Sequence, residues 1–252
     1  MIELLRPQWP APAHVAACVS TRNGGVSEAP FATLNLGDHV GDDVAAVIAN
    51  RQLLREACPG LSAISWLEQI HGIDVVAAAA QIVQRADAQF TREPGIACAV
   101  MTADCLPVLF CDRAGTQVAA AHAGWRGLCA GVLERTAAQF NRSADVLVWL
   151  GPAIGPRNFA VGAEVRQQFL DTTPALAVQI AACFVASSRP GHYLADIYQL
   201  ARVRLRALGI SAIYGGGLCS VADPERFYSY RRDGVCGRMA TLIYLIPTQI
   251  TA

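Results

Sequence analysis

An acid and a thiol interrupt an otherwise apolar stretch in MTADCLPVLFC, residues 101–111. Residues 96–103 and 106–111 are predicted to be buried strands, because both are rich in apolar residues and of strand length. Burial of the Asp104 carboxylate is unfavourable unless another group pairs with it. We therefore expect Asp104 and Cys105 to serve a purpose other than packing.

Further predicted elements extend outward from this stretch in both directions. The sequence indicates strands at 14–20, 63–67, 73–78, 116–121, about 145–150 and 237–247, and helices at 41–60, 125–140, 162–171 and 194–209. Strands and helices do not alternate regularly, which favours an α+β (irregular α/β) fold with mixed central β-sheets flanked by helices. No linker or repeat divides the chain, so residues 1–252 are predicted to form one domain.

Composition excludes several classes of protein. Hydrophobic residues make up 53% of the chain and the formal net charge is zero, which does not favour binding to nucleic acid or to an anionic membrane. The sequence contains no lysine, so Schiff-base and phosphate-loop lysine chemistry are excluded. The N-terminus lacks a signal-peptide pattern, and the nine cysteines form no CxxC pair. These features predict a cytoplasmic protein with reduced thiols and no membrane span.

Two histidines share with Cys105 a position near the end of a predicted strand. His71 is followed by Gly72, and His122 is followed by Ala123. If the three strand ends converge, one thiolate and two imidazoles suit a divalent metal, most commonly zinc. Asp104 could then orient a histidine ligand or act as a base on water.

The same atoms allow two other interpretations. Cys105 could be the nucleophile of a thiol hydrolase, with His122 or His71 as its base. A His-Cys-His site could also bind copper, with Met101 as a weak axial ligand. A multicopper cluster would need more imidazoles than the five histidines of this chain provide.

Three polar residues outside this set are candidates for binding. Arg22 precedes a Gly-Gly turn, Asn35 lies in TLNLG, and Arg126 is at the start of a predicted helix. The free N–H groups there favour an anion, and Arg126 would strengthen the attraction.

Six ordered motifs resemble one known family, which is called polyphenol oxidase (laccase-like), purine nucleoside phosphorylase or peptidoglycan editing factor. They are STRNGGVSEAPFATLNLGDHVGDD, LEQIHG, MTADCLPVLF, AAHAGWRGL, LGPAIGPRNFAVGAEV and FYSYRRDGVCGRMA. The resemblance implies a single α+β domain with His71, Cys105 and His122 as metal ligands. It also implies that Arg22, Asn35, Asp104 and Arg126 line the same pocket. One departure is Ala160, where the family usually has glutamate.

The resemblance implies a function that sequence patterns alone do not reach. The leading expectation is a zinc-dependent purine nucleoside phosphorylase with adenosine deaminase activity, acting on adenosine, inosine and methylthioadenosine. Asp104, Cys105 and Arg126 would take part in catalysis, Arg22 or Arg126 would hold phosphate, and Arg22 and Asn35 would contact substrate. The alternatives are a copper-dependent polyphenol oxidase and a cell-wall precursor editing hydrolase with Cys105 as nucleophile. No amphipathic stripe lacks a core role, which favours a monomer.

Overall fold

The structure is a computed structural model and describes residues 2–247. Its strands are β1 (Leu4–Leu5), β2 (Val15–Ser20), β3 (Ala63–Ser65), β4 (Leu67–Glu68), β5 (Val75–Ala77), β6 (Gln84–Arg85), β7 (Ala88–Thr91), β8 (Ile96–Thr102), β9 (Leu106–Asp112), β10 (Val118–Ala123), β11 (Val146–Leu150), β12 (Ala160–Gly162), β13 (Phe184–Ala186), β14 (His192–Ala195), β15 (Ile213–Gly215) and β16 (Met239–Leu245). Its helices are α1 (Val44–Glu56), α2 (Trp125–Ala130), α3 (Val132–Ala137), α4 (Ala163–Thr172), α5 (Ala177–Ala181), α6 (Ile197–Ala207) and α7 (Tyr230–Asp233), with short 3₁₀ turns at Ser143–Asp145 and Pro174–Leu176.

Two large mixed sheets form the centre of the molecule. One has the strand order β1-β2-β16-β8-β3, and the other has the order β15-β11-β9-β10-β7-β5. Most neighbouring strands are antiparallel, whereas β3 with β8, β5 with β7, and β11 with β15 are parallel. The predicted α+β fold with mixed sheets is therefore confirmed.

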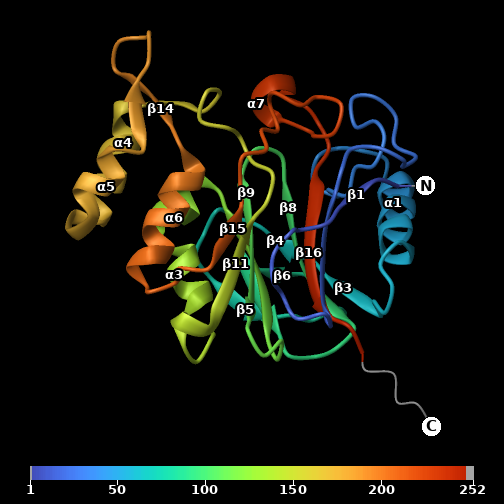
Figure 1. The fold of residues 1–252 in the computed structure, drawn as a ribbon. Coiled ribbons are helices and arrows are strands. Elements are labelled where there is room, and N and C mark those ends of the chain that lie inside the picture. Colours follow the sequence, from blue (N-terminus) through green and yellow to red (C-terminus); the bar gives the residue numbers. More distant parts are fainter. Residues whose placement is uncertain (1, 248–252) are drawn as a thin grey trace.

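The two large sheets pack face to face and are covered by helices on their outer faces (Figure 1). Alternation along β9 produces this layering: Leu109 points into the core between the sheets, whereas Val108 and Phe110 pack against the helical side. Helix α1 covers the five-stranded sheet through Leu54, and α3 and α6 cover the six-stranded sheet. Because both faces are buried, β8 to β10 read as continuous apolar runs rather than as alternating patterns.

Two predicted helices have different limits in the structure. The helix expected over 125–140 is interrupted at Gly131, whose φ of 108° ends α2 and begins α3. The helix expected over 194–209 begins only at Ile197, because residues 192–195 form β14 and pair with β12 and β13. The carboxylate of Asp196 accepts a hydrogen bond from the Gln199 amide and caps α6 at this point.

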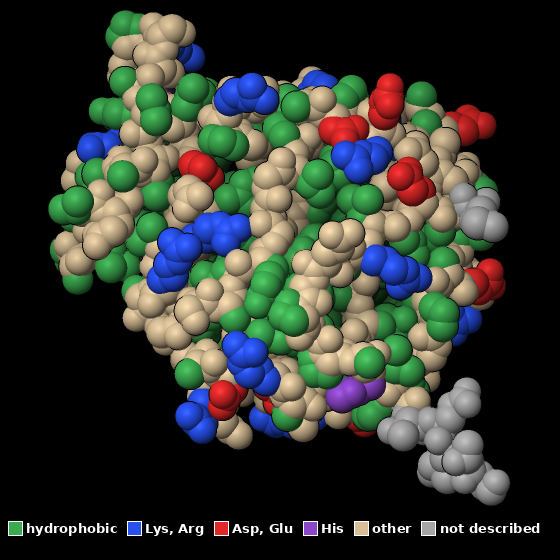
Figure 2. All heavy atoms as spheres, viewed as in Figure 1, with side chains coloured by type: hydrophobic (Ala, Val, Ile, Leu, Met, Phe, Trp, Pro, Cys, Tyr) green, Lys and Arg blue, Asp and Glu red, His purple; other side chains and the backbone are tan. Residues whose placement is uncertain are grey.

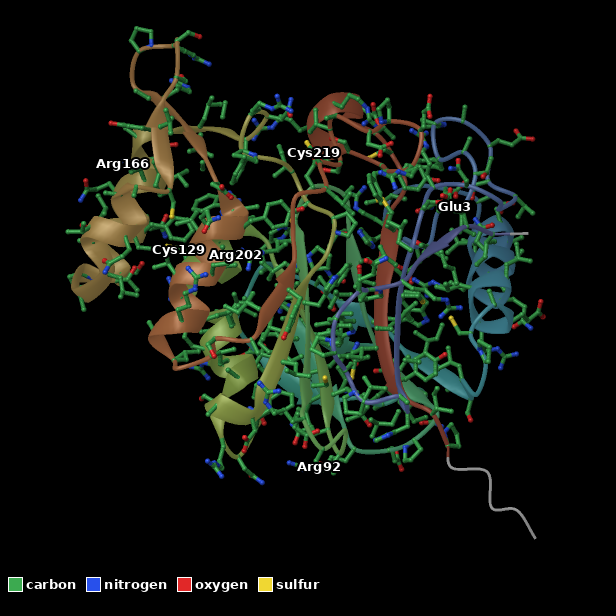
Figure 3. The ribbon with its side chains drawn as sticks, in the orientation of Figure 1. Glu3, Arg92, Cys129, Arg166, Arg202 and Cys219 are labelled. Atoms are coloured by element: carbon green, nitrogen blue, oxygen red, sulfur yellow. The ribbon has the colours of Figure 1, made fainter. Side chains whose placement is uncertain are left out.

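The remaining differences concern short elements that the sequence analysis did not predict. They include β7, the β12-β14-β13 sheet, α5 and α7. The strand expected over 63–67 is divided at Trp66 into β3 and β4, which belong to different sheets. Contacts with other elements hold short strands in place. For example, Arg202 of α6, labelled in Figure 3, donates hydrogen bonds to the Ile213 and Gly215 carbonyls of the short strand β15.

The surface carries dispersed charge. Arginine side chains are spread over the face drawn in Figure 2, with acidic side chains among them. Within residues 2–247, no helix has both the length and the apolar character needed to cross a membrane.

Candidate metal centre and its two cavities

The candidate metal centre lies where the chain crosses from one large sheet to the other. Strand β8 belongs to the five-stranded sheet and β9 to the six-stranded sheet, so residues 103–105 connect the two layers. Cys105 ends this connection. His122 is in β10, paired in register with Pro107 of β9, and His71 is in the loop between β4 and β5.

The geometry of the three side chains fits a metal ion. Cys105 Sγ lies 3.6 Å from His71 Nε2, the two imidazole rings are 4.7 Å apart between centroids, and the three ligand atoms lie within 4.8 Å of one another. Nitrogen and sulfur ligands around a tetrahedral metal are about 3.6 Å apart when the bonds to the metal are about 2.1 and 2.3 Å. His71, Cys105 and His122 could therefore hold one metal ion with a fourth position open.

A buried carboxylate that the sequence analysis did not identify organises this centre. Asp87 is fully buried and accepts a hydrogen bond from His122 Nδ1 at 2.7 Å. Its carboxylate also accepts hydrogen bonds from the backbone amides of Ile70, His71 and Gly72. Asp87 thus holds the His71 loop and leaves His122 Nε2 available as a ligand atom.

The electrostatics of the metal-free site favour a thiolate. Burial alone would raise the pKa of Cys105, but the charge and hydrogen bonds of His122 and His71 outweigh it and lower the pKa to about 6. Burial lowers the pKa of His122, whereas the Cys105 charge and the Asp87 hydrogen bond raise it to about 9 overall. Cys105 therefore ionises readily, as a metal ligand must.

The backbone around the centre is strained and closely packed. Within the described residues, His71 (φ 60°) and Asp104 (φ 89°) are the two non-glycine residues with positive φ. Such conformations are costly and concentrate at functional sites. A Cβ on Gly124 would lie 2.6 Å from His71 Cδ2 and 3.1 Å from Cys105 Sγ, so glycine is required for this approach.

Two cavities meet at the metal centre and share His71, Ala103, Cys105 and Tyr230 as walls. The first, called here the Arg238 cavity, has a volume of about 340 Å³ and is also lined by His39, Gln69, Met101, Thr102, His122 and Arg238. The second, called here the Trp125 cavity, has a volume of about 280 Å³ and is also lined by Asp104, Trp125, Arg126, Ile154, Phe159, Ile197 and Arg231. Their position allows a substrate with two chemically different parts to reach the metal from both sides.

Asp104 does not have the place that the sequence analysis suggested beside a histidine. One carboxylate oxygen accepts a hydrogen bond from Ser220 Oγ and the other from the Arg231 amide, each at 2.6 Å. Asp104 therefore connects the crossover that carries Cys105 to α7 and the segment before it, while Asp87 orients His122. Its carboxylate still forms part of the Trp125 cavity wall.

The other predicted site residues are in two different settings. Arg126 lines the Trp125 cavity, with its guanidinium 4.4 Å from the Trp125 ring centroid. Arg22 donates to the backbone carbonyls of Ala32 and Pro224, and Asn35 is fully buried. Neither Arg22 nor Asn35 is in the wall of either cavity as residues 2–247 form it. Direct contact of these two residues with substrate stays a prediction.

Sequence reasoning missed Asp87, His39 and Arg238. Asp87 lies in ADAQF, a short apolar run with one acid, which is the same kind of signal that identified Asp104. His39 and Arg238 come from regions far apart in the chain, so no spacing could have joined them.

Comparison with known proteins extends these observations. A purine nucleoside phosphorylase from Pseudomonas aeruginosa is 57% identical over 96% of this chain and 98% of its own length. The purine nucleoside phosphorylase YfiH of Escherichia coli is 54% identical over 98% of this chain and 100% of its own length. The solved structure of a Neisseria meningitidis protein of the DUF152 family has a TM-score of 0.91 at 47% identity, covering 97% of this chain and 99% of that one.

Residues 16–246 also match the sequence pattern of one family over almost the whole described fold. This match, the close relatives and the His-Cys-His geometry agree with one another. The chain therefore belongs to the family described as multi-copper polyphenol oxidoreductase laccase.

Proposed function

We propose that this protein is a zinc-dependent purine nucleoside phosphorylase that also deaminates adenosine. The observation that carries the proposal is the His71, Cys105 and His122 cluster at the junction of two cavities. The names of close relatives from Pseudomonas aeruginosa and Escherichia coli support the phosphorylase activity. The proposed substrates are adenosine, inosine and methylthioadenosine.

A zinc ion held by this cluster would supply Lewis acidity beside the bound substrate. The residues of the chain would provide binding and orientation. Asp87 fixes the His122 ring through the 2.7 Å hydrogen bond to Nδ1. The Trp125 cavity offers apolar faces to a purine, and Arg126 at its wall would favour negative charge on substrate or product.

Turnover of adenosine tests the proposal directly. Metal-loaded protein with adenosine and phosphate should give adenine and ribose 1-phosphate, and without phosphate it should give inosine. Cys105→Ala should lose both activities together with bound metal. Silence of metal-replete wild-type protein toward all three nucleosides would refute the proposal.

Copper-dependent phenol oxidation is a second candidate. The family description supports it, and Met101 lies in the cavity wall beside the three ligands. Metal analysis of purified protein together with oxygen uptake on a phenol separates the two functions. Copper with oxygen uptake would favour the oxidase, whereas zinc without oxygen uptake would exclude it.

Retention of full activity by metal-free protein would point instead to Cys105 as a nucleophile. A cell-wall precursor would then be the substrate to test.

A further inference from the structure

We propose that inorganic phosphate binds in the Arg238 cavity, held by Arg238 beside His39, while the purine occupies the Trp125 cavity. The inference rests on the proposed phosphorylase function and assigns the phosphate to one cavity and the purine to the other.

The walls of the two cavities differ in charge and polarity. The Trp125 cavity has apolar walls from Trp125, Ile154, Phe159 and Ile197, and its charged residues are Arg126, Arg231 and Asp104. Flat apolar walls suit a purine ring, and the Asp104 carboxylate offsets part of the attraction of the two arginines for a phosphate dianion. The Arg238 cavity contains Arg238 and His39, and the described residues give it no carboxylate in its wall.

Arg238 has unused capacity to bind an anion. Its Nη1 donates to the Cys236 and Gly237 carbonyls, which fixes the guanidinium in place. Within residues 2–247, Nε and Nη2 have no hydrogen-bond partner and Arg238 takes part in no ion pair. A guanidinium with free donors at a cavity wall is well suited to the oxygens of phosphate.

His39 lies close enough to Arg238 to sense its charge. Burial and then the Arg238 charge lower the pKa of His39, while Asp38 acts in the opposite direction. Asp38 itself is paired with Arg51 at 3.2 Å, so its charge is partly neutralised. His39 is therefore neutral at pH 7, with Nδ1 facing Asp38 at 3.5 Å, and it lines the same space as Arg238 from a second segment.

Asn35 positions both of these segments. Its Oδ1 accepts hydrogen bonds from the Arg238 amide at 2.8 Å and from the Gly37 amide at 2.9 Å. Its Nδ2 donates to the Gly37 carbonyl and to the Asp42 carboxylate. All the hydrogen-bonding groups of this buried amide thus hold the loop that carries His39 against the strand that follows Arg238. Asn35 acts through Arg238 and His39, as a positioning residue.

The close packing of Gly37 supports the same arrangement. A Cβ at this position would lie 2.9 Å from Arg238 Cγ, so the loop approaches the stem of the arginine directly. Tyr230, which lines both cavities, lies 6.0 Å from the guanidinium, measured to its ring centroid. Arg238 is therefore close to the junction where the two halves of the substrate must meet.

The assignment gives a balanced reaction. A phosphate oxygen forms a bond to C1′ of the ribose while the C1′–N9 bond breaks. The electron pair of that bond goes to the purine, which takes up the proton that the attacking hydrogen phosphate gives up. The products are ribose 1-phosphate and the free base, and neither oxidant nor reductant is consumed. Attack from one cavity and departure into the other place the two events on opposite sides of the sugar.

Phosphorolysis of inosine by metal-loaded Arg238→Ala and His39→Ala tests the inference. We expect Arg238→Ala to raise KM for phosphate about 10- to 100-fold, because the variant loses hydrogen bonds to a charged group. KM for inosine should change less than about threefold. Arg238→Lys should restore part of the affinity. His39 is exposed, so His39→Ala should fold and should raise KM for phosphate by a smaller factor. Exposed Arg206→Ala is the matched control and should leave both constants unchanged.

Arg126→Ala distinguishes the competing assignment, in which phosphate occupies the Trp125 cavity. A rise in KM for phosphate in Arg126→Ala, with none in Arg238→Ala or His39→Ala, would overturn the inference. Titration of metal-loaded protein with inorganic phosphate by calorimetry should show weaker binding to Arg238→Ala than to wild type. Absence of phosphorolysis in wild type would instead refute the proposed function itself, so the two failures are distinguishable.

Discussion

Asp87 organises the metal centre from outside the set of ligands. Its carboxylate binds the His122 ring and three consecutive backbone amides that begin at Ile70. Burial raises the pKa of Asp87, but the His122 interactions and the amides outweigh this and lower it. The carboxylate is therefore ionised when it receives these hydrogen bonds.

Asp87→Asn should lower metal affinity about 10- to 100-fold, because loss of a hydrogen bond that orients a ligand has effects of this size. The amide nitrogen of asparagine would face N–H donors instead of accepting from them. Competition with a chelating dye measures the affinity. Asp112→Asn, which alters a distant turn around Thr116, is the control. Unchanged affinity in folded Asp87→Asn would contradict this role.

The reactivity of Cys105 should depend on pH in a characteristic way. In metal-free protein its pKa is lowered to about 6, so the thiolate predominates above that pH and the thiol predominates below it. Alkylation by iodoacetamide should therefore rise with pH around a midpoint of about 6 and level off by pH 7. Mass spectrometry at several pH values measures this, and bound metal should block the reaction. A midpoint near 9 would show that the histidines do not activate the thiol.

Residue types revealed the three candidate ligands in the sequence but not the residues that hold them in place. His71, Cys105 and His122 are rare, chemically distinctive side chains beside strand ends. Asp87 resembles any other acid in a short strand until its partners are known. Contact of Asn35 with substrate stays a prediction, and its buried hydrogen bond with the Arg238 amide joins two segments that no local sequence pattern connects.

At the scale of elements, the helical spacing of apolar residues does not predict the break between α2 and α3. Residues 125–140 have apolar spacing suitable for one helix, but Gly131 adopts a left-handed conformation and the chain changes direction there. The short α2 then follows the end of β10 that carries the candidate ligand His122, and α3 packs against the six-stranded sheet. Long strands with a buried pattern were predicted well, whereas two- and three-residue strands depend on partners far away in the sequence.

Gly131→Ala should destabilise the fold by about 1 kcal/mol, because alanine disfavours a φ of 108°. The new Cβ would meet its nearest neighbour, Glu134 Oε2, at 3.6 Å, so the backbone accounts for the cost. Urea unfolding measures the change. Gly131→Asn should lose less, since asparagine tolerates the left-handed region better. Equal losses in both variants would argue against the backbone explanation.

At the scale of the whole molecule, the candidate metal site draws its ligands from three segments that are far apart in the sequence. The ligands come from the β4–β5 loop, the crossover between the two large sheets, and β10. A metal ion held by all three would bind only the folded chain, so its binding energy adds to the stability of the entire domain.

Removal of metal by a chelator should therefore lower the melting temperature by about 10 °C. Metal at about a thousand times its dissociation constant stabilises by about 4 kcal/mol, and 1 kcal/mol shifts a domain of this size by about 2–4 °C. Differential scanning calorimetry with and without chelator measures the shift. Cys105→Ala should show a much smaller shift, and an equal shift would mean that the metal binds elsewhere.

The crossover at residues 103–105 links the substrate side of the site to the packing between the two sheets. Cys105 directly precedes β9, and β9 pairs with the His122 strand β10, so the spacing between thiolate and imidazole is set within the six-stranded sheet. Ala103 and Asp104 connect this sheet to β8 of the five-stranded sheet and also line the Trp125 cavity. A shift of one sheet over the other would therefore move the cavity wall more than the candidate ligands. Substitutions in the hydrophobic core between the sheets could thus reshape the Trp125 cavity while the three candidate ligands keep their spacing.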